Sequence, residues 1–308
     1  IPFEVYAFSD SYNGRNRYSR YHVEESVDFK VGDIVLNAGF KLLNMFSSNM
    51  SLNDEMTMMH ILWMYATYYS HEYRDWSKVG YPYTPPASLQ LGGTPLNDAI
   101  IAMMDLVPQF KKDTGVQKVN TIFLTDGASH RLERVYDYHF DSRTNEHTKT
   151  VKPLKSGYWG TRKENSDIIT DPVVNKTYEI TSMTNDLLRI LKGRVPGMNV
   201  IGFFIAGNGK SGRVDKNTLR YLLPFDEMHE IMQKIKFINK NKYLAISQLG
   251  YDEYYVLPGG SALKTENETL DDELIGAGKA KLKSAFTKMS KGKLASRQLL
   301  NKFVGLVA

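Results

Sequence analysis

Two oxygen-bearing side chains stand at places in this sequence where they could bind a hard cation. Thr94 follows a Gly-Gly turn and precedes Pro95, a residue type favoured at the first position of a helix. Its hydroxyl is therefore expected at or beside a helix N-cap. Asp126 follows the apolar run 121–125, which is typical of a buried parallel strand that delivers a carboxylate to the carboxyl edge of a sheet. Hydroxyl and carboxylate oxygens are ligands for Mg²⁺ or Mn²⁺.

This pattern resembles the von Willebrand factor A (VWA) family. In that family a metal-ion-dependent adhesion site (MIDAS) combines a D-x-S-x-S loop, a threonine in a Gly-Gly-Thr turn and an aspartate in a strand ending Thr-Asp-Gly. Thr94 and Asp126 match the last two elements. The resemblance follows the element order over residues 1–258. Within the family, the long helical insertion before the Gly-Gly-Thr turn is similar to the cobaltochelatase large-subunit branch and to phage-encoded VWA proteins.

The first element of the motif is missing, because no D-x-S-x-S occurs in the 308 residues. The nearest approach begins at Asp10 and has glycine, Gly14, in place of the second serine. The run 3–9 before it looks like the family's second strand. We therefore expect the first strand, the D-x-S-x-S loop and the first helix to lie upstream of Ile1. On this reading, Mg²⁺ or Mn²⁺ binds only if that loop is supplied.

Two further positions near the candidate site have open roles. The stretch from Ser9 to Ser11 could supply an auxiliary ligand or cap a loop. Asp98 lies one helical turn beyond Thr94 and could support the site or face solvent. The simplest alternative for the whole arrangement is that Asp126 caps a turn and Thr94 caps its helix.

The elements that must position these residues alternate between strand and helix. This predicts an α/β fold with a doubly wound, mostly parallel sheet, helices on both faces, and a basic C-terminal helix. Strands are expected at 3–9, 119–125, 199–206, 242–247 and 254–257. Helices are expected at 34–46, at 53–65 with Asn53 or Asp54 as cap, at 95–112 with an interruption near Pro108, at 181–194 and at 226–236. The Met-rich stripe of the second helix is expected to pack in the core.

The chain is expected to form one VWA-like domain over residues 1–258, with insertions at about 10–90 and 129–176, and a charged linker and basic helix over 259–308. The insertion 129–176 could be a lid, a hairpin insertion or an interface. From Leu274 onward the chain has eight Lys or Arg residues and no acid. The segment from Lys279 to Lys302 is then either a solvated helix face or a contact for nucleic acid.

Composition and absent motifs exclude several classes of function. The chain has no cysteine, which excludes disulfides, thiolate zinc sites and cysteine nucleophiles. No run reaches the ~18 to 20 apolar residues that cross a bilayer, so no membrane contact is expected. No phosphate loop, zinc-protease helix or serine nucleophile elbow occurs, which predicts that the chain is not an enzyme. We expect a cytoplasmic location, in the host cytoplasm if the protein is viral.

The function expected from these features is that of a non-enzymatic binding module. A divalent ion at Thr94 and Asp126 would leave one position open for a carboxylate of a protein partner. Since chelatase-type VWA proteins work beside an AAA+ ATPase, the resemblance implies such a partner here. Two alternatives remain: a nucleic-acid-binding protein that uses the basic tail, and a virion structural or assembly protein that uses the VWA fold as a scaffold.

Overall fold

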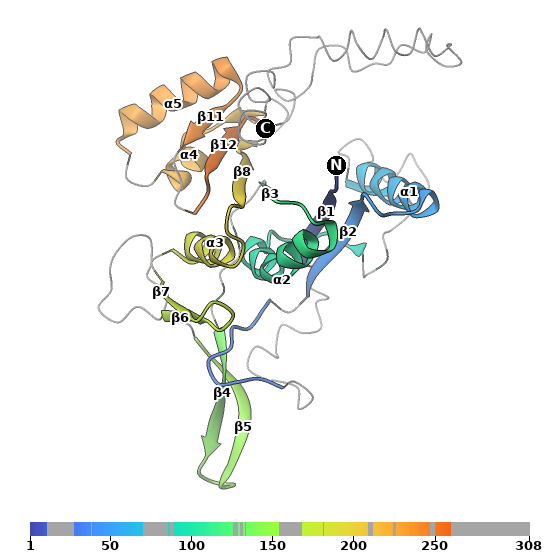
Figure 1. The fold of residues 1–308 in the computed structure, drawn as a ribbon. Coiled ribbons are helices and arrows are strands. Elements are labelled where there is room, and N and C mark those ends of the chain that lie inside the picture. The colour runs from blue at the N-terminus through green and yellow to red at the C-terminus, as the bar shows by residue number, and fades with distance from the viewer. Residues whose placement is uncertain are drawn as a thin grey trace, which may run out of the picture. The chain divides into compact units, whose positions relative to one another are not determined.

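The chain divides into two compact units in the computed structural model. Figure 1 shows the helices and strands of the chain. Unit 1 comprises Ile1–Gln117 and Ala128–Pro196, and unit 2 comprises Lys118–Gly127 and Gly197–Ala308. The structure describes residues 1–10, 28–37, 39–69, 86, 89–125, 129, 132, 134–153, 168–180, 182–208, 212–223, 226–246 and 250–259. The single domain expected over residues 1–258 stays a prediction.

Unit 1 begins with an antiparallel pair of strands. β1 (Glu4–Asp10) confirms the strand predicted at 3–9, and it pairs with β2 (Phe40–Ser47). The helix predicted at 34–46 is therefore wrong, because most of that segment is strand β2. Apolar residues occupy both faces of β2, so the alternation typical of a strand is not visible in its sequence. Pairing with β1, which is distant in the sequence, determines the strand instead.

The helix α1 (Leu52–Tyr69) confirms the prediction of a helix after Ser51. The expected caps are wrong, however, because the Ser51 hydroxyl accepts the backbone N–H of Asp54 at 3.3 Å. That bond satisfies one of the free N–H groups of the first turn. Neither Asn53 nor Asp54 is needed as the cap, and the helix begins before both of them.

The methionines of α1 lie on two sides of the helix. Met64 is buried with Tyr65 and with Met45 of β2 in a small apolar core. Met56 and Met59, by contrast, are exposed. The expected packing of the methionine stripe is thus observed for the side that meets the β1–β2 pair and not for the opposite side.

The helices α2 (Leu96–Thr114) and α3 (Met183–Arg194) pack against each other in unit 1 and confirm the helices predicted at 95–112 and 181–194. Their buried apolar residues include Ile100, Leu188 and Leu191. Gly115 ends α2 in a left-handed conformation with φ of 69°, and its N–H bonds to the carbonyl of Lys111. A glycine is favoured there because a Cβ is strained at positive φ.

Pro108 does not interrupt α2, which corrects the expected break. A proline inside a helix removes the N–H that would bond the carbonyl four residues earlier, here that of Met104. That carbonyl instead accepts the Nη1 group of Arg194 from α3 at 3.3 Å. The helix continues because a neighbouring side chain supplies the missing donor.

Two hairpins occupy the described part of the insertion that was expected to be a lid, a hairpin insertion or an interface. β4 (Arg134–Asp141) pairs with β5 (Glu146–Pro153), and β6 (Ile168–Asp171) pairs with β7 (Lys176–Glu179), both in antiparallel register. Asn145 and Asn175 precede β5 and β7 at positive φ, a conformation that asparagine tolerates in tight turns. Among the described residues, the hairpin reading of this insertion is the one observed.

Unit 2 is built on a four-stranded sheet of order β11-β12-β8-β3. The strands predicted at 119–125, 199–206, 242–247 and 254–257 correspond to β3 (Asn120–Thr125), β8 (Asn199–Ile205), β11 (Leu244–Ile246) and β12 (Glu253–Leu257). β8 pairs in parallel with both β3 and β12, and β11 is an antiparallel edge strand. Four of the seven residues of β8 are buried, as expected of a parallel strand in a sheet. The burial expected for the run 121–125 is wrong in part, because Ile122 and Leu124 of β3 are exposed while Phe123 and Thr125 are buried.

Two helices and a short strand pair complete the described part of unit 2. α5 (Met228–Asn241) confirms the helix predicted at 226–236, while α4 (Lys216–Leu222) and the pair β9 (Gly207–Asn208) and β10 (Arg213–Val214) were not predicted. Leu219 of α4, Ile231 and Ile238 of α5 and Val256 of β12 share one buried core. The chain is therefore mixed α/β, with parallel and antiparallel strands in one sheet. Within the described residues, no helix is both long and apolar enough to span a bilayer.

Candidate metal-binding site

Thr94 lies in the loop that leads into α2, directly before the N-cap residue Pro95. This is the place expected from the Gly-Gly-Thr-Pro sequence. The carbonyl of Thr94 accepts the N–H of Leu96 at 2.9 Å. The side chain is half-buried, and its hydroxyl has no hydrogen-bond partner among the residues that the structure describes. That hydroxyl is therefore available to a ligand.

The Gly-Gly turn before Thr94 is fixed by the end of β1. The N–H of Gly92 donates to the Ser9 hydroxyl at 2.7 Å, and the N–H of Gly93 donates to Asp10 Oδ1 at 2.6 Å. A Cβ on Gly92 would lie 1.6 Å from the carbonyl oxygen of Asp10, so no side chain fits there. Ser9 and Asp10 are buried and bind the turn, which is the loop-capping role rather than direct ligation. Ser11 lies outside the described residues.

Asp98 points into unit 1, so the expectation that it could face solvent is wrong, and its support of the candidate site stays a prediction. The residue is fully buried, and both of its oxygens accept hydrogen bonds from Asn37, one from the backbone N–H and one from Nδ2, each at 2.7 Å. Burial raises the pKa of Asp98, the bonds from Asn37 lower it, and the negative charge of Asp10 raises it further. The net pKa lies above the usual value, because removal from water is the largest of these effects.

A second set of polar contacts holds the first turn of α2. The N–H of Asn97 donates to the Ser129 hydroxyl at 2.9 Å, and the Thr184 hydroxyl of α3 donates to Asn97 Oδ1 at 2.7 Å. Asn97 therefore joins α2 to α3 and to the chain just after β3. The roles of Asn37, Asn97, Ser129 and Thr184 were not predicted, because each depends on a contact between residues far apart in the sequence.

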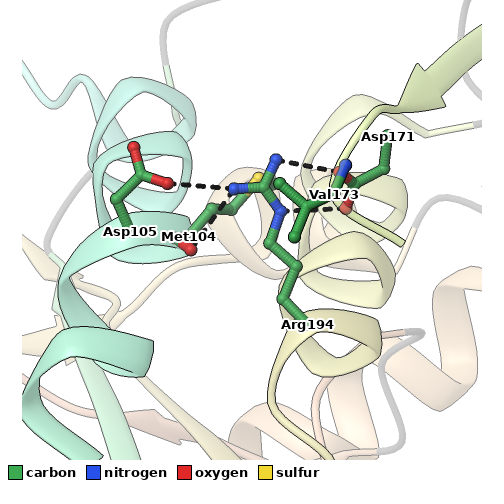
Figure 2. A network of polar contacts seen from close by, with 5 residues as sticks. All are labelled: Met104, Asp105, Asp171, Val173 and Arg194. Atoms are coloured by element: carbon green, nitrogen blue, oxygen red, sulfur yellow. Dashed lines mark hydrogen bonds and ion pairs between the residues drawn. The ribbon is translucent and has the colours of Figure 1, made fainter. Parts of the chain in front are cut away.

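The far end of the α2–α3 pair is held by Arg194 (Figure 2). Its Nε and Nη2 groups bind the two oxygens of Asp171 at 2.9 Å each, and Nη1 binds Asp105 at 3.0 Å. Burial pushes the pKa of Asp171 up, but the bonds from Arg194 and from the backbone N–H of Val173 outweigh it, and the pKa falls below its usual value. This network connects α2, α3 and the β6–β7 hairpin, and it keeps α2 in position while its first turn carries the candidate site.

Asp126 lies outside the described residues, so its convergence with Thr94 stays a prediction. No cluster of three or more histidine, cysteine, aspartate or glutamate residues that could hold a metal is found in the described part of the chain. The basic segment from Lys279 to Lys302 also lies outside that part, and its contact with nucleic acid stays a prediction.

Comparison of the chain with protein-family models, with curated proteins and with solved structures found no match.

Proposed function

We propose that this chain is a non-enzymatic binding module of the VWA type, with a doubly wound sheet. In the proposal, Thr94 and Asp126 hold Mg²⁺ or Mn²⁺, and an open position on the ion takes a carboxylate from a protein partner. An AAA+ ATPase is the partner class that the VWA resemblance implies. The observation that carries the proposal is the Thr94 hydroxyl, half-buried before α2 with no protein partner in the described residues.

The surroundings of Thr94 favour a cation electrostatically. A helix N-terminus carries about half a positive charge, which alone would repel a metal ion. Asp98 in the first turn of α2 and Asp10 beside the Gly-Gly turn are both buried and add negative charge close to Thr94. Asp10 accepts the N–H of Gly93 in the turn and Asp98 accepts the N–H of Asn37, so both would act on the ion through their charge rather than as direct ligands.

Two features of the strand before Asp126 support the proposal. β3 pairs in parallel with β8, and Thr125 at its carboxyl end is buried. Ligands of parallel sheets bind at that end of the strands. Ser129, three positions after Asp126 in the sequence, is bound to Asn97 of α2. The donor set of one hydroxyl and one carboxylate suits a hard cation, and the D-x-S-x-S loop would complete it.

Calorimetric titration with Mn²⁺ and Mg²⁺ tests the proposal, on this chain alone and with an added peptide that carries a D-x-S-x-S loop. Thr94→Ala and Asp126→Ala are each expected to weaken binding by about 10- to 100-fold, because each removes one oxygen ligand. Thr94→Ser keeps the hydroxyl and is the matched control, with affinity close to that of the parent. Thermal unfolding of each variant verifies that the fold is retained. Equal affinity for Thr94→Ala, Asp126→Ala and the parent chain would refute the metal role.

A further inference from the structure

The β4–β5 hairpin of unit 1 separates its side chains into two chemically different faces. Residues that pair directly across antiparallel strands share a face, and so do residues two apart along a strand. By the observed register, one face, which we name the aromatic face, carries Arg134, Tyr136, Tyr138, Phe140, His147 and Lys149. Neither β4 nor β5 places an acidic residue on this face.

All the acidic residues of the two strands lie on the opposite face. By the same register it carries Asp137, His139, Asp141, Glu146 and Lys152. Lys152 forms an ion pair with Asp137, and this bond, together with the N–H of Tyr138, lowers the pKa of Asp137. Because all the acids of the two strands lie on the opposite face, the charged side chains that β4 and β5 place on the aromatic face are basic.

The aromatic face already accepts a flat ring from the chain itself. Phe29 stacks on Tyr136 with ring centroids 4.7 Å apart and an interplanar angle of 16°, and it lies 5.1 Å from the ring of Tyr138. Lys149 Nζ sits 5.7 Å from the centre of the Phe29 ring. The backbone near Phe29 is held to β4, because the N–H of Gly32 donates to the carbonyl of Tyr136 at 2.8 Å. Rings therefore stack here in the folded protein.

Beyond Phe29 the same face continues with rings that are open to solvent. The exposed fraction is 41% for Tyr138 and 48% for Phe140, and the Phe140 ring lies 5.0 Å from that of His147. Side chains two apart on a strand are about 6.8 Å apart. Successive bases of a duplex strand are only about 3.4 Å apart, so bases that stack on both rings must be spread as in an extended single strand.

We propose that the aromatic face binds single-stranded nucleic acid. Bases stack on Tyr138 and Phe140, and a polyanionic strand is tolerated because neither β4 nor β5 places an acid on this face. Stacking tolerates any base, so binding is expected to have little sequence preference and a strong dependence on salt. This site shares no residue with the one proposed at Thr94, and it is separate from the basic segment beyond Leu274.

The test is fluorescence anisotropy of the full chain with a labelled single strand of about 15 nucleotides, a length near the upper site size of known single-strand binders. Phe140→Ala and Tyr138→Ala are each expected to weaken binding about 5- to 100-fold through the loss of one stacked base. Phe140→Trp keeps a ring and is expected to bind as well as the parent. Thr148→Ala on the opposite face is the control for a change in the same hairpin, with affinity unchanged.

Photocross-linking of a bromouracil-containing strand locates the contact. Cross-links to Tyr138 or Phe140 are expected, together with weaker binding of a duplex of the same sequence. Three results would overturn the proposal: cross-links confined to residues 279–302, affinity unaffected by both alanine variants, or equal competition by an acidic polypeptide that has no rings to stack. Thr94→Ala and Asp126→Ala should bind the strand normally, so failure of the metal proposal is distinguishable from failure of this one.

Discussion

Asp98 shows how a single buried acid couples the candidate site to pH. Its pKa is raised on folding, so the folded chain holds this proton more tightly than the unfolded chain, in which an aspartate titrates near ~3.9. The contribution of this group to the free energy of unfolding therefore falls as pH rises from that value through the raised pKa. Asn37 limits the loss, because it donates to both oxygens of the charged form.

Asn37→Ala is expected to lower the free energy of unfolding by about 1–3 kcal/mol at pH 7, since the ionised carboxylate loses its Nδ2 donor. The loss should shrink as pH falls through the pKa of Asp98, because a neutral carboxyl group depends less on that donor. Urea unfolding across this pH range measures both effects. Asn49→Ala, at an exposed asparagine, is the control, with a change under about 0.5 kcal/mol. A loss that is the same at every pH would contradict the role given to Asp98.

At the scale of elements, a side chain of α3 donates the hydrogen bond that α2 lacks at Pro108. The Met104 carbonyl lacks the usual N–H partner because of Pro108, and Arg194 donates to it instead. In Pro108→Ala the backbone would supply that donor, so the cost of removing Arg194 should fall. Arg194→Met is expected to cost about 3–5 kcal/mol in the parent chain, chiefly because Asp171 is left buried and charged without its partner.

A double-mutant cycle of Pro108→Ala and Arg194→Met measures this coupling by denaturant unfolding. We expect a coupling of about 0.5–1.5 kcal/mol, the net worth of one hydrogen bond. Asp105→Asn is the matched control at the exposed end of the same network. Its side chain is 89% exposed, so the change should stay under about 1 kcal/mol. Strict additivity of the two substitutions would show that Arg194 does not replace the donor that Pro108 lacks.

The elements also show which parts of the fold can be predicted from a sequence. α1, α3, β3 and β8 follow from local periodicity, and the structure confirms them. Strand β2 does not follow from local periodicity, because it depends on pairing with β1. The continuation of α2 beyond Pro108 does not follow from it either, because Arg194 from α3 donates to the Met104 carbonyl. The candidate site divides in the same way: the position of Thr94 follows from local sequence, whereas the pairing of Asn37 with Asp98 spans 61 residues and has no local signal.

At the scale of the whole molecule, the two compact units predict two separate units of cooperative unfolding. Leu188 is fully buried in unit 1, and Ile238 is fully buried in unit 2. Leu188→Ala and Ile238→Ala should each cost about 2–5 kcal/mol and should speed amide hydrogen exchange mainly in the unit that carries the substitution. Exchange followed by mass spectrometry resolves the two responses. Equal acceleration in both units by either variant would instead support one domain over residues 1–258.

The route of the chain has a consequence for how the protein is made. β3 belongs to unit 2, yet it is translated between two stretches of unit 1, and its parallel neighbour β8 comes only after α3. During synthesis this apolar strand therefore lacks its sheet partner until both hairpins and α3 have been translated. Newly made chains are vulnerable to aggregation during that interval, and slow translation between β3 and β8 would lengthen it.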